Sequence, residues 1–325
     1  MTRYIIKRLL ITIPTIVLVA IMIFTVLYFT PGDPAEQILG STATTEELAA
    51  YRTYLGIDRP YHVRLLDYLH GLFIEGDLGT SWMSKIDIMT EIRNRLPRTF
   101  AISLYSILVG AVCGIPLGVM AAVHQNGKAD KAVLVMSSVM HCIPGYVIAM
   151  VLIVVFALKL KWFPPYGITE GLKSYVLPCI CILLGSFSAL ARSMRSQMLE
   201  VIRSDFVVAA KAQGFSKNSV YYLHALPNAL IPIITQIGQQ FAGALGGTMI
   251  LETIFSIPGM GLYVQGAITS RDVPVVTGCV IFLAIWFCLV MLGVDILYAL
   301  VDPRIKAQYE AQGKARHSKR SVKAK

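Results

Sequence analysis

Charged side chains are scarce in this sequence. Only 15% of its 325 residues are Asp, Glu, Lys or Arg, whereas 55% are hydrophobic, and the mean hydropathy is +0.64. Soluble domains usually have about 25% charged residues, so an ordinary soluble domain is excluded. The apolar side chains must face something other than water, and the first prediction is an integral membrane protein.

Six long stretches contain no charged residue at all. Most approach or exceed the roughly 20 residues that a helix needs to cross the hydrocarbon core of a bilayer. Helices are predicted because an open sheet would leave unpaired backbone groups in lipid, and a barrel would show short alternating segments. The fold class is therefore all-α, polytopic, with about six transmembrane helices. The stretches are Leu9–Thr30, Phe100–Val123, Ala132–Leu158, Tyr175–Ala191 (short, and expected to continue through Arg192), Ala229–Leu251 and Val276–Val294.

The first stretch lacks the features of a cleaved signal peptide. Arg3, Lys7 and Arg8 precede it, as in a secretory signal, but no cleavage site of small residues follows. Its 22 uncharged residues also exceed a typical signal-peptide core. We interpret it as a retained first transmembrane helix.

Basic residues are concentrated in alternate connections between the stretches. Cytoplasmic loops of membrane proteins carry an excess of Lys and Arg. With the N-terminus inside, the internal connections hold 18 basic and 5 acidic residues, whereas the external segment 31–98 has 7 basic and 10 acidic residues. Both termini are therefore predicted to be cytoplasmic. The internal connections are residues 1–8, 124–131, 192–228 and 302–325.

This orientation also accounts for the net charge of +10. The basic run from Lys314 to Arg320 contains no aromatic residue, so nucleic acid is not a predicted partner, and the run is interpreted as an anchor near anionic lipid.

The predicted division of the chain is a cytoplasmic N-terminus with the first transmembrane helix (1–30), an external segment (31–98), a five-helix core (99–301) with an internal connection (192–228), and a basic cytoplasmic tail (302–325).

Several motifs that carry enzymatic chemistry are absent. The sequence has no Gly-x-x-x-x-Gly-Lys-Ser/Thr loop for nucleotide phosphates, no His-Glu-x-x-His and no Gly-x-Ser-x-Gly. The six cysteines lie in apolar stretches, where thiols act as small hydrophobes. His141 and Cys142 have no second pair of ligands, and His141 is expected to be a hydrogen-bonded core residue. We predict no enzyme, and no metal or cofactor on this chain.

The external segment is too polar to span a bilayer and is predicted to form helices of its own. Thr44 and Glu47 have the spacing of a capping box. Apolar residues at near-helical spacing between Tyr61 and Phe73 predict an amphipathic helix on the outer surface, and Gly76 is expected to end it.

Two of the apolar stretches contain residues suited to contacts between helices. Gly110, Gly114 and Gly118 are four residues apart, a spacing that lets another helix approach closely. The fifth stretch has three amides, which are costly to expose to lipid and are predicted to line a pathway, with a gate nearby, or a subunit interface. These amides belong to Gln236, Gln239 and Gln240.

The longest internal connection is the most specific part of the sequence. Small residues around Ala209 and Ala210 predict a short helix ended by Gly214, and Ser216 is a suitable cap for a second helix that runs to Pro227. Two short helices joined by a glycine turn predict a rigid knob facing the cytoplasm.

This knob resembles the Glu-Ala-Ala loop of ABC importer permeases. In that loop Glu-Ala-Ala is followed by three residues and a glycine, and then by nine residues, a hydrophobic residue, any residue and Leu-Pro. Val208 replaces the glutamate here and His224 the hydrophobic residue, so no salt bridge from that glutamate is inferred. The matching places are held by Ala209, Ala210, Gly214, Leu226 and Pro227.

The resemblance covers nearly the whole chain and is closest to the dipeptide, oligopeptide and nickel permeases. It is carried by several short motifs in the same order. They are Arg3-Tyr4 through Arg8-Leu9, Pro31-Gly32-Asp33-Pro34, Leu55 to Pro60, Gly76 to Ser81, Glu252 to Gly259 and Asp302-Pro303-Arg304.

The resemblance implies a permease subunit of a bacterial or archaeal inner membrane. It implies a homologous second permease, two cytoplasmic ATPase subunits that bind ATP and Mg, and an external solute-binding protein. Ala209, Ala210 and Gly214 are expected to seat in an ATPase subunit, with Asp205 and Lys211 adding contacts at the rim.

By the same resemblance, the turn from Glu252 to Ile257 with Pro258 and Gly259 is expected to form an outer gate, and residues 31–98 to meet the binding protein. The implied cargo is a small peptide.

Two alternatives stay open at the level of the sequence. Nickel or glutathione importers of the same family are the first. A gradient-driven secondary transporter is the second, and it would need ionisable groups within the membrane. Its candidates are Asp295, Glu252 and His141.

Overall fold

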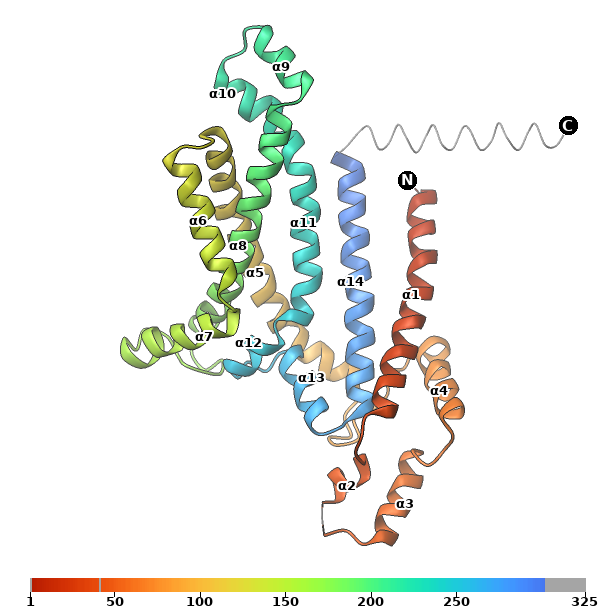
Figure 1. The fold of residues 1–325 in the computed structure, drawn as a ribbon. Helices are drawn as coiled ribbons and strands as arrows, with labels where there is room; N and C mark the ends of the chain where they lie inside the picture. The colour runs from red at the N-terminus through yellow and green to blue at the C-terminus, as the bar shows by residue number, and fades with distance from the viewer. Residues whose placement is uncertain (1, 41, 302–325) are drawn as a thin grey trace, which may run out of the picture.

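The fold is built from helices. A computed structural model describes residues 2–40 and 42–301, and within them the only pairing of extended chain is an isolated bridge between Thr80 and Asp87. Figure 1 shows the arrangement. The elements are α1 Thr2–Phe29, α2 Pro34–Leu39, α3 Thr45–Leu55, α4 Tyr61–His70, α5 Ile88–Val123, α6 Lys128–Cys142, α7 Gly145–Leu152, α8 Lys173–Ile202, α9 Asp205–Ala212, α10 Lys217–Ser219, α11 Leu226–Gly247, α12 Met249–Ile254, α13 Met260–Thr269 and α14 Val273–Val301, with π-helical turns η1 Gly71–Glu75, η2 Ile153–Lys159 and η3 Val220–Ala225.

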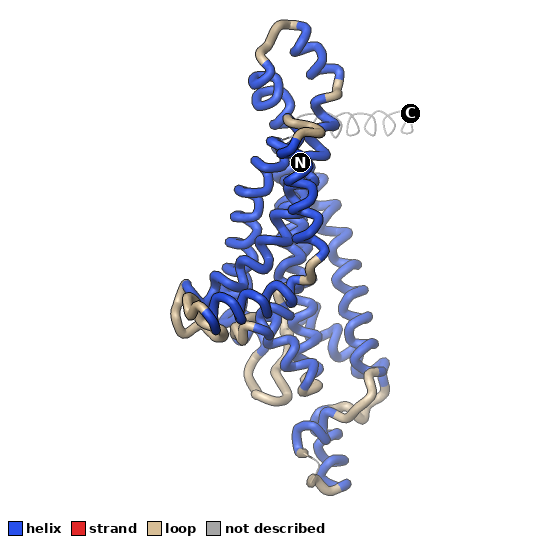
Figure 2. The backbone as a smooth tube through the Cα atoms, turned by 60° about the vertical axis from the view of Figure 1, so that its left-hand side comes forward, coloured by secondary structure: helices blue, strands red, loops and turns tan. Residues whose placement is uncertain are grey.

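Long helices form a bundle in which α1, α5, α8, α11 and α14 run alongside one another (Figures 1 and 2). Within the described residues, α1, α5, α8 and α14 are long and apolar enough to cross a bilayer, and a bent pair, α6 with α7 and η2, raises the number to five. The predicted all-α polytopic fold is therefore confirmed. The fifth predicted stretch, Ala229–Leu251, is divided between the 22-residue α11 and the start of α12, and α11 is not among these spans.

The third predicted stretch, Ala132–Leu158, is not one helix. It is divided between α6 and the pair α7 and η2, and the two parts are bent by 90°. Ile143 and Pro144 lie at the break with extended ψ angles of 120° and 139°. Proline lacks an N–H to continue the helical bonds, and its ring disfavours a helical residue before it. The prediction of one continuous helix over this stretch is wrong, and α7 projects sideways from the bundle (Figure 1).

Other boundaries shift by a few turns. α5 begins at Ile88, after Asp87 accepts a hydrogen bond from the Thr90 N–H at 2.7 Å. The last part of the predicted external segment is therefore the start of a membrane helix. α8 continues through Arg192 as predicted and ends at Ile202.

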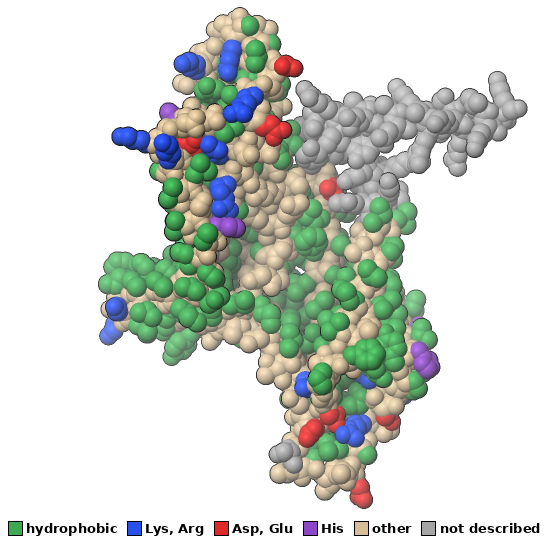
Figure 3. Space-filling view, viewed as in Figure 1, with side chains coloured by type: hydrophobic (Ala, Val, Ile, Leu, Met, Phe, Trp, Pro, Cys, Tyr) green, Lys and Arg blue, Asp and Glu red, His purple; other side chains and the backbone are tan. Residues whose placement is uncertain are grey.

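The two ends of the bundle carry different helices and different charged side chains. The start of α1 and the end of α14 lie at the same end as α9 and α10, whereas α2 and α3 extend from the opposite end (Figure 1). Lys and Arg side chains gather over the α9–α10 end, and both signs of charge mix around α2 and α3 (Figure 3).

The predicted capping box of the external segment is confirmed. The Glu47 N–H donates to the Thr44 hydroxyl at 3.3 Å, and the Thr44 N–H donates to the Glu47 carboxylate at 2.8 Å. These bonds from the Thr44 backbone and hydroxyl hold the pKa of Glu47 below its usual range. The box fixes the start of α3.

The predicted amphipathic helix forms α4, continues as η1 and stops at Gly76, which has a φ of +69°. It packs against α1 and does not lie free on the outer surface. The Tyr61 and Thr25 hydroxyls are 2.7 Å apart, and the rings of Tyr68 and Phe24 stack with centroids 5.3 Å apart. α4 is thus part of the end of the bundle opposite α9 and α10.

α5 and α8 approach so closely that their contact requires glycine. A Cβ on Gly118 would lie 2.5 Å from the Ala191 carbonyl oxygen, and one on Gly114 would lie 2.9 Å from the Phe187 carbonyl oxygen. Gly110 faces the same helix. The stripe of small residues therefore packs against a helix of the same chain.

Replacing Gly118 with valine is expected to destabilise the bundle by about 1–3 kcal/mol or more, because overpacked helices must move apart. Thermal unfolding of the detergent-purified chain measures this as a lower Tm. Gly185→Val on α8 is the control, since a Cβ there has no atom within 4 Å. An equal fall in Tm for both variants would contradict the role assigned to the α5–α8 contact.

Candidate functional site

The internal connection forms the predicted knob beyond the end of α8. α9 is followed by Gly214 in the left-handed region with a φ of +85°, and the Ser216 hydroxyl caps α10 by accepting the Ser219 N–H at 3.3 Å. Val207 and Val220 are fully buried between the knob and the end of α8. The knob is therefore a rigid extension of the bundle.

The two faces of the knob differ in exposure. Ala209, Gly214, Asp205 and Lys211 are exposed. Ala210 is 7% exposed and packs into the knob's own core. Seating of Ala210 in a partner stays a prediction, and in the single chain its side chain packs inward.

Large apolar side chains that are exposed on the knob were not predicted from the sequence. Their exposed fractions run from 41% for Phe206 to 71% for Leu223. Where exposed apolar side chains gather into a patch, they mark an interaction surface. The exposed set is Phe206, Val208, Phe215, Tyr222 and Leu223.

His224 stands where the resembled loop has a hydrophobic residue, and its side chain packs against an aromatic ring there. Its ring lies against the ring of Phe215, with centroids 5.0 Å apart. The chain then enters α11 at Leu226, with Pro227 in the first turn, where a missing N–H costs no helical bond.

An ion pair braces the base of the knob. The Arg195 guanidinium on α8 forms two hydrogen bonds with the Asp130 carboxylate on α6, one of them at 2.8 Å. Asp130 is 1% exposed and also accepts the Asn126 N–H at 2.8 Å. No signal in the sequence indicated this pair because its members are 65 positions apart in the chain.

At the opposite end of the bundle, Glu252 forms the centre of a buried hydrogen-bond network. It is 1% exposed. One carboxylate oxygen accepts the hydroxyls of Thr99 and Thr248 at 2.6 and 3.0 Å. The other accepts the N–H groups of Gly261 and Leu262 at 2.7 and 3.1 Å, at the N-terminus of α13. A single carboxylate therefore joins α5, α12 and α13.

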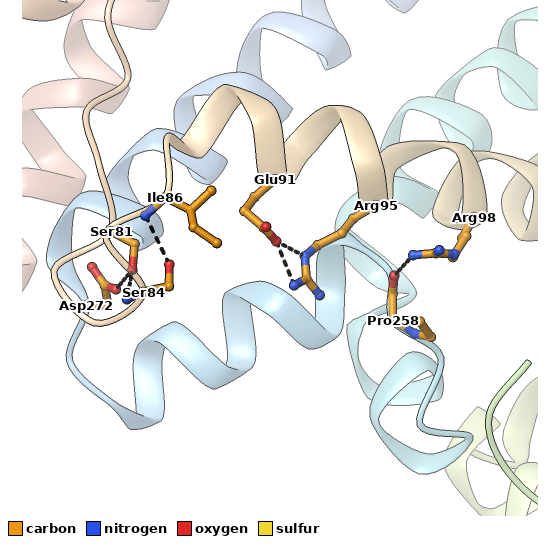
Figure 4. A network of polar contacts seen from close by, with 8 residues as sticks. All are labelled: Ser81, Ser84, Ile86, Glu91, Arg95, Arg98, Pro258 and Asp272. Atoms are coloured by element: carbon orange, nitrogen blue, oxygen red, sulfur yellow. Dashed lines mark hydrogen bonds and ion pairs between the residues drawn. The ribbon is translucent and has the colours of Figure 1, made fainter.

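The turn from Phe255 to Gly259 is held against this network. A Cβ on Gly259 would lie 2.4 Å from the Glu252 carboxylate. The Arg98 guanidinium donates to the Pro258 carbonyl at 2.9 Å (Figure 4). The structure thus brings Glu252, Pro258 and Gly259 together, and their role as a gate stays a prediction.

Other predicted residues lie apart from this turn. On α11, Gln236 and Gln240 are half-buried, and Gln239 is exposed in the single chain. His141 is exposed, so its expected place in the core is wrong. Asp295 is half-buried on α14. Within residues 2–40 and 42–301, no three His, Cys, Asp or Glu side chains are grouped so that they could hold a metal ion.

Two family descriptions match most of the chain. Residues 1–103 match the N-terminal region of the binding-protein-dependent transport system membrane component, and residues 114–307 match the binding-protein-dependent transport system inner membrane component. The chain belongs to this family. It is the permease of an ABC importer, and the alternative of a gradient-driven transporter is wrong.

Relatives of this permease align over almost their full length. The glutathione transport system permease protein GsiC of Salmonella typhimurium is 34% identical over 306 residues, which cover 94% of this chain and 99% of that protein. A peptide transport system permease protein of Brucella abortus is 36% identical over 313 residues, with coverage of 94% and 99%.

A solved structure has a similar fold. In an inward-facing form of the MetNI methionine ABC transporter, one chain aligns with a TM-score of 0.56 and 19% identity over 66% of this permease and 98% of that chain. At this identity the likeness shows the fold alone.

Glu252→Gln is expected to lower both the stability and the transport rate of the permease. The amide has one acceptor oxygen in place of two, so a buried donor loses its partner at a cost of roughly 1–3 kcal/mol. Thermal unfolding and substrate uptake measure the two effects. Glu170→Gln, at an exposed position, is the control. Unchanged Tm and uptake in Glu252→Gln would refute the role of the network.

Proposed function

We propose that this permease moves small peptides into the cell as part of an ATP-driven importer. The observation that carries the substrate class is its similarity to the Brucella abortus protein and to a peptide ABC transporter permease protein of Sinorhizobium fredii, which is 34% identical over 310 residues. Because both align over at least 93% of this chain, the similarity extends to the outer segment as well as to the knob.

The outer face of the knob is the proposed contact with a cytoplasmic ATPase subunit. Support comes from its exposed apolar side chains, such as Phe215 and Leu223, and from its rigid connection to α8 through the buried Val207. A movement of the knob would be carried into the bundle by the Asp130–Arg195 ion pair. ATP and Mg belong to the ATPase subunits in this proposal.

The knob end is proposed to face the cytoplasm. Support comes from the excess of basic residues in the connections at that end. α2 and α3 then stand outside, farthest from the bundle (Figure 1), and form the proposed contact with the solute-binding protein. A homologous second permease would complete the pathway, which opens alternately to each side.

Glutathione is the second candidate substrate, because GsiC is similar over nearly its whole length. Uptake of labelled dipeptide, glutathione and nickel into a strain lacking this permease separates the candidates. Loss of dipeptide uptake that the wild-type chain restores is the expected result. Loss confined to glutathione or to nickel would overturn the peptide assignment.

A pull-down of the tagged permease tests the knob. Gly214→Trp places a bulky side chain at a residue whose φ of +85° suits only glycine. We expect the variant to lose the ATPase subunits while it retains the second permease, identified by mass spectrometry.

The matched control is Gly171→Trp, another left-handed glycine with no atom within 4 Å of its Cβ, in the loop before α8. It should recover all subunits. Retention of the ATPase subunits by Gly214→Trp would contradict docking at the knob.

A further inference from the structure

Asp272 is a buried carboxylate in the turn between α13 and α14, with an exposed fraction of 3%. It accepts the Ser81 hydroxyl at 2.5 Å and the N–H groups of Trp82 and Met83 at 3.0 and 3.2 Å. All three donors come from the loop before α5, about 190 residues earlier in the chain. Asp272 therefore joins the external segment to α13.

Two further contacts converge on the same turn. The Arg271 guanidinium donates to the Pro31 carbonyl, and it occupies the space that a Cβ on Gly32 would need. The Gln37 amide, turned so that its nitrogen donates, reaches the carbonyls of Thr269 and Ser270 at 3.2 and 3.0 Å. Three separate sets of contacts thus join the external segment to residues 269–272.

The other end of α13 is held by Glu252, through the N–H groups of Gly261 and Leu262. α13 has ten residues, so these two carboxylates lie at either end of a rigid helix about 15 Å long. The start of α5 runs beside it, with Asp272 and Ser81 near one end and Arg98 and Pro258 near the other (Figure 4). Displacement of one end of α13 must move the other.

A turn that only linked α13 to α14 would not need a buried carboxylate, which is costly to remove from water unless several donors surround it. Here every donor belongs to the external segment. The carboxylate therefore makes the position of α13 depend on the position of that segment.

We propose that Asp272 is the positioning residue that transmits docking of the solute-binding protein from the external segment to α13, and through Glu252 to the turn from Phe255 to Gly259, the predicted gate. The proposal rests on the proposed function, in which α2 and α3 meet the binding protein. It assigns to one carboxylate the signal that couples docking to opening of the gate.

The test uses the whole complex, purified with its partner permease and ATPase subunits and reconstituted in lipid nanodiscs. ATP hydrolysis is measured while the solute-binding protein that copurifies with the system is titrated in. Asp272→Asn has only one acceptor oxygen for the three donors. We expect a roughly tenfold loss of stimulation by the binding protein, equivalent to about 1.4 kcal/mol of coupling.

Affinity for the binding protein is measured separately, by its retention on immobilised nanodiscs. The proposal requires this affinity and hydrolysis without binding protein to stay within twofold of wild type, since neither α2 and α3 nor the ATPase subunits are altered. A residue with only a structural role would lower yield, affinity and hydrolysis together.

Two further variants keep the test decisive if Asp272→Asn fails to fold. Ser81→Ala removes a single donor and should give a smaller loss of stimulation. Asp77→Asn is the matched control, because Asp77 accepts only the local Gly79 N–H, at 2.8 Å, among its hydrogen bonds in the described residues, and should behave as wild type.

The outcomes separate the two claims. A wild-type complex that binding protein does not stimulate would overturn the proposed function itself. Normal stimulation in wild type that is equally strong in Asp272→Asn and Ser81→Ala would overturn the role of Asp272 alone.

Discussion

The close packing of α5 on α8 is the contact on which the rest of the structure depends. Gly114 and Gly118 bring the two backbones together, and few side chains separate them. α8 then leaves the bundle at one end and supports the knob, while at the other end α5 supplies Thr99 to the Glu252 network and Arg98 to the Pro258 carbonyl. The knob and the predicted gate are therefore built on one pair of helices, through which a movement of the knob could reach the turn from Phe255 to Gly259.

Buried acidic residues mark the places where distant parts of the chain meet. Asp130 joins α6 to α8, Glu252 joins α5 and α12 to α13, and Asp272 joins the external segment to the start of α14. A buried charge is costly without partners, so each carboxylate holds its donors in one arrangement. In a protein with so few charges, these three define how the ends of the helices are positioned.

The position of the knob in the chain was predictable from the sequence, but the side chains that it exposes were not. The order of Ala209, Gly214 and Pro227 located the knob, and its glycine turn and serine cap follow from local rules. Which face of α9 points outward depends on how α9 packs against α8. That packing buries Ala210 and exposes Phe206 and Leu223, and no local rule contains it.

By itself, the sequence determined the class of fold, the existence of most of the long helices, the capping box and the family, because these depend on local composition, periodicity and short motifs. Tertiary structure alone decided the 90° bend at Pro144, the packing of α4 on α1, and the pairing of Asp272 with residues 81–83. The physical reason is the distance along the chain over which each interaction acts. Hydropathy and capping act within a few turns of helix. The other features either join groups that only the folded backbone brings close together, or depend on the apolar surface against which a broken helix packs.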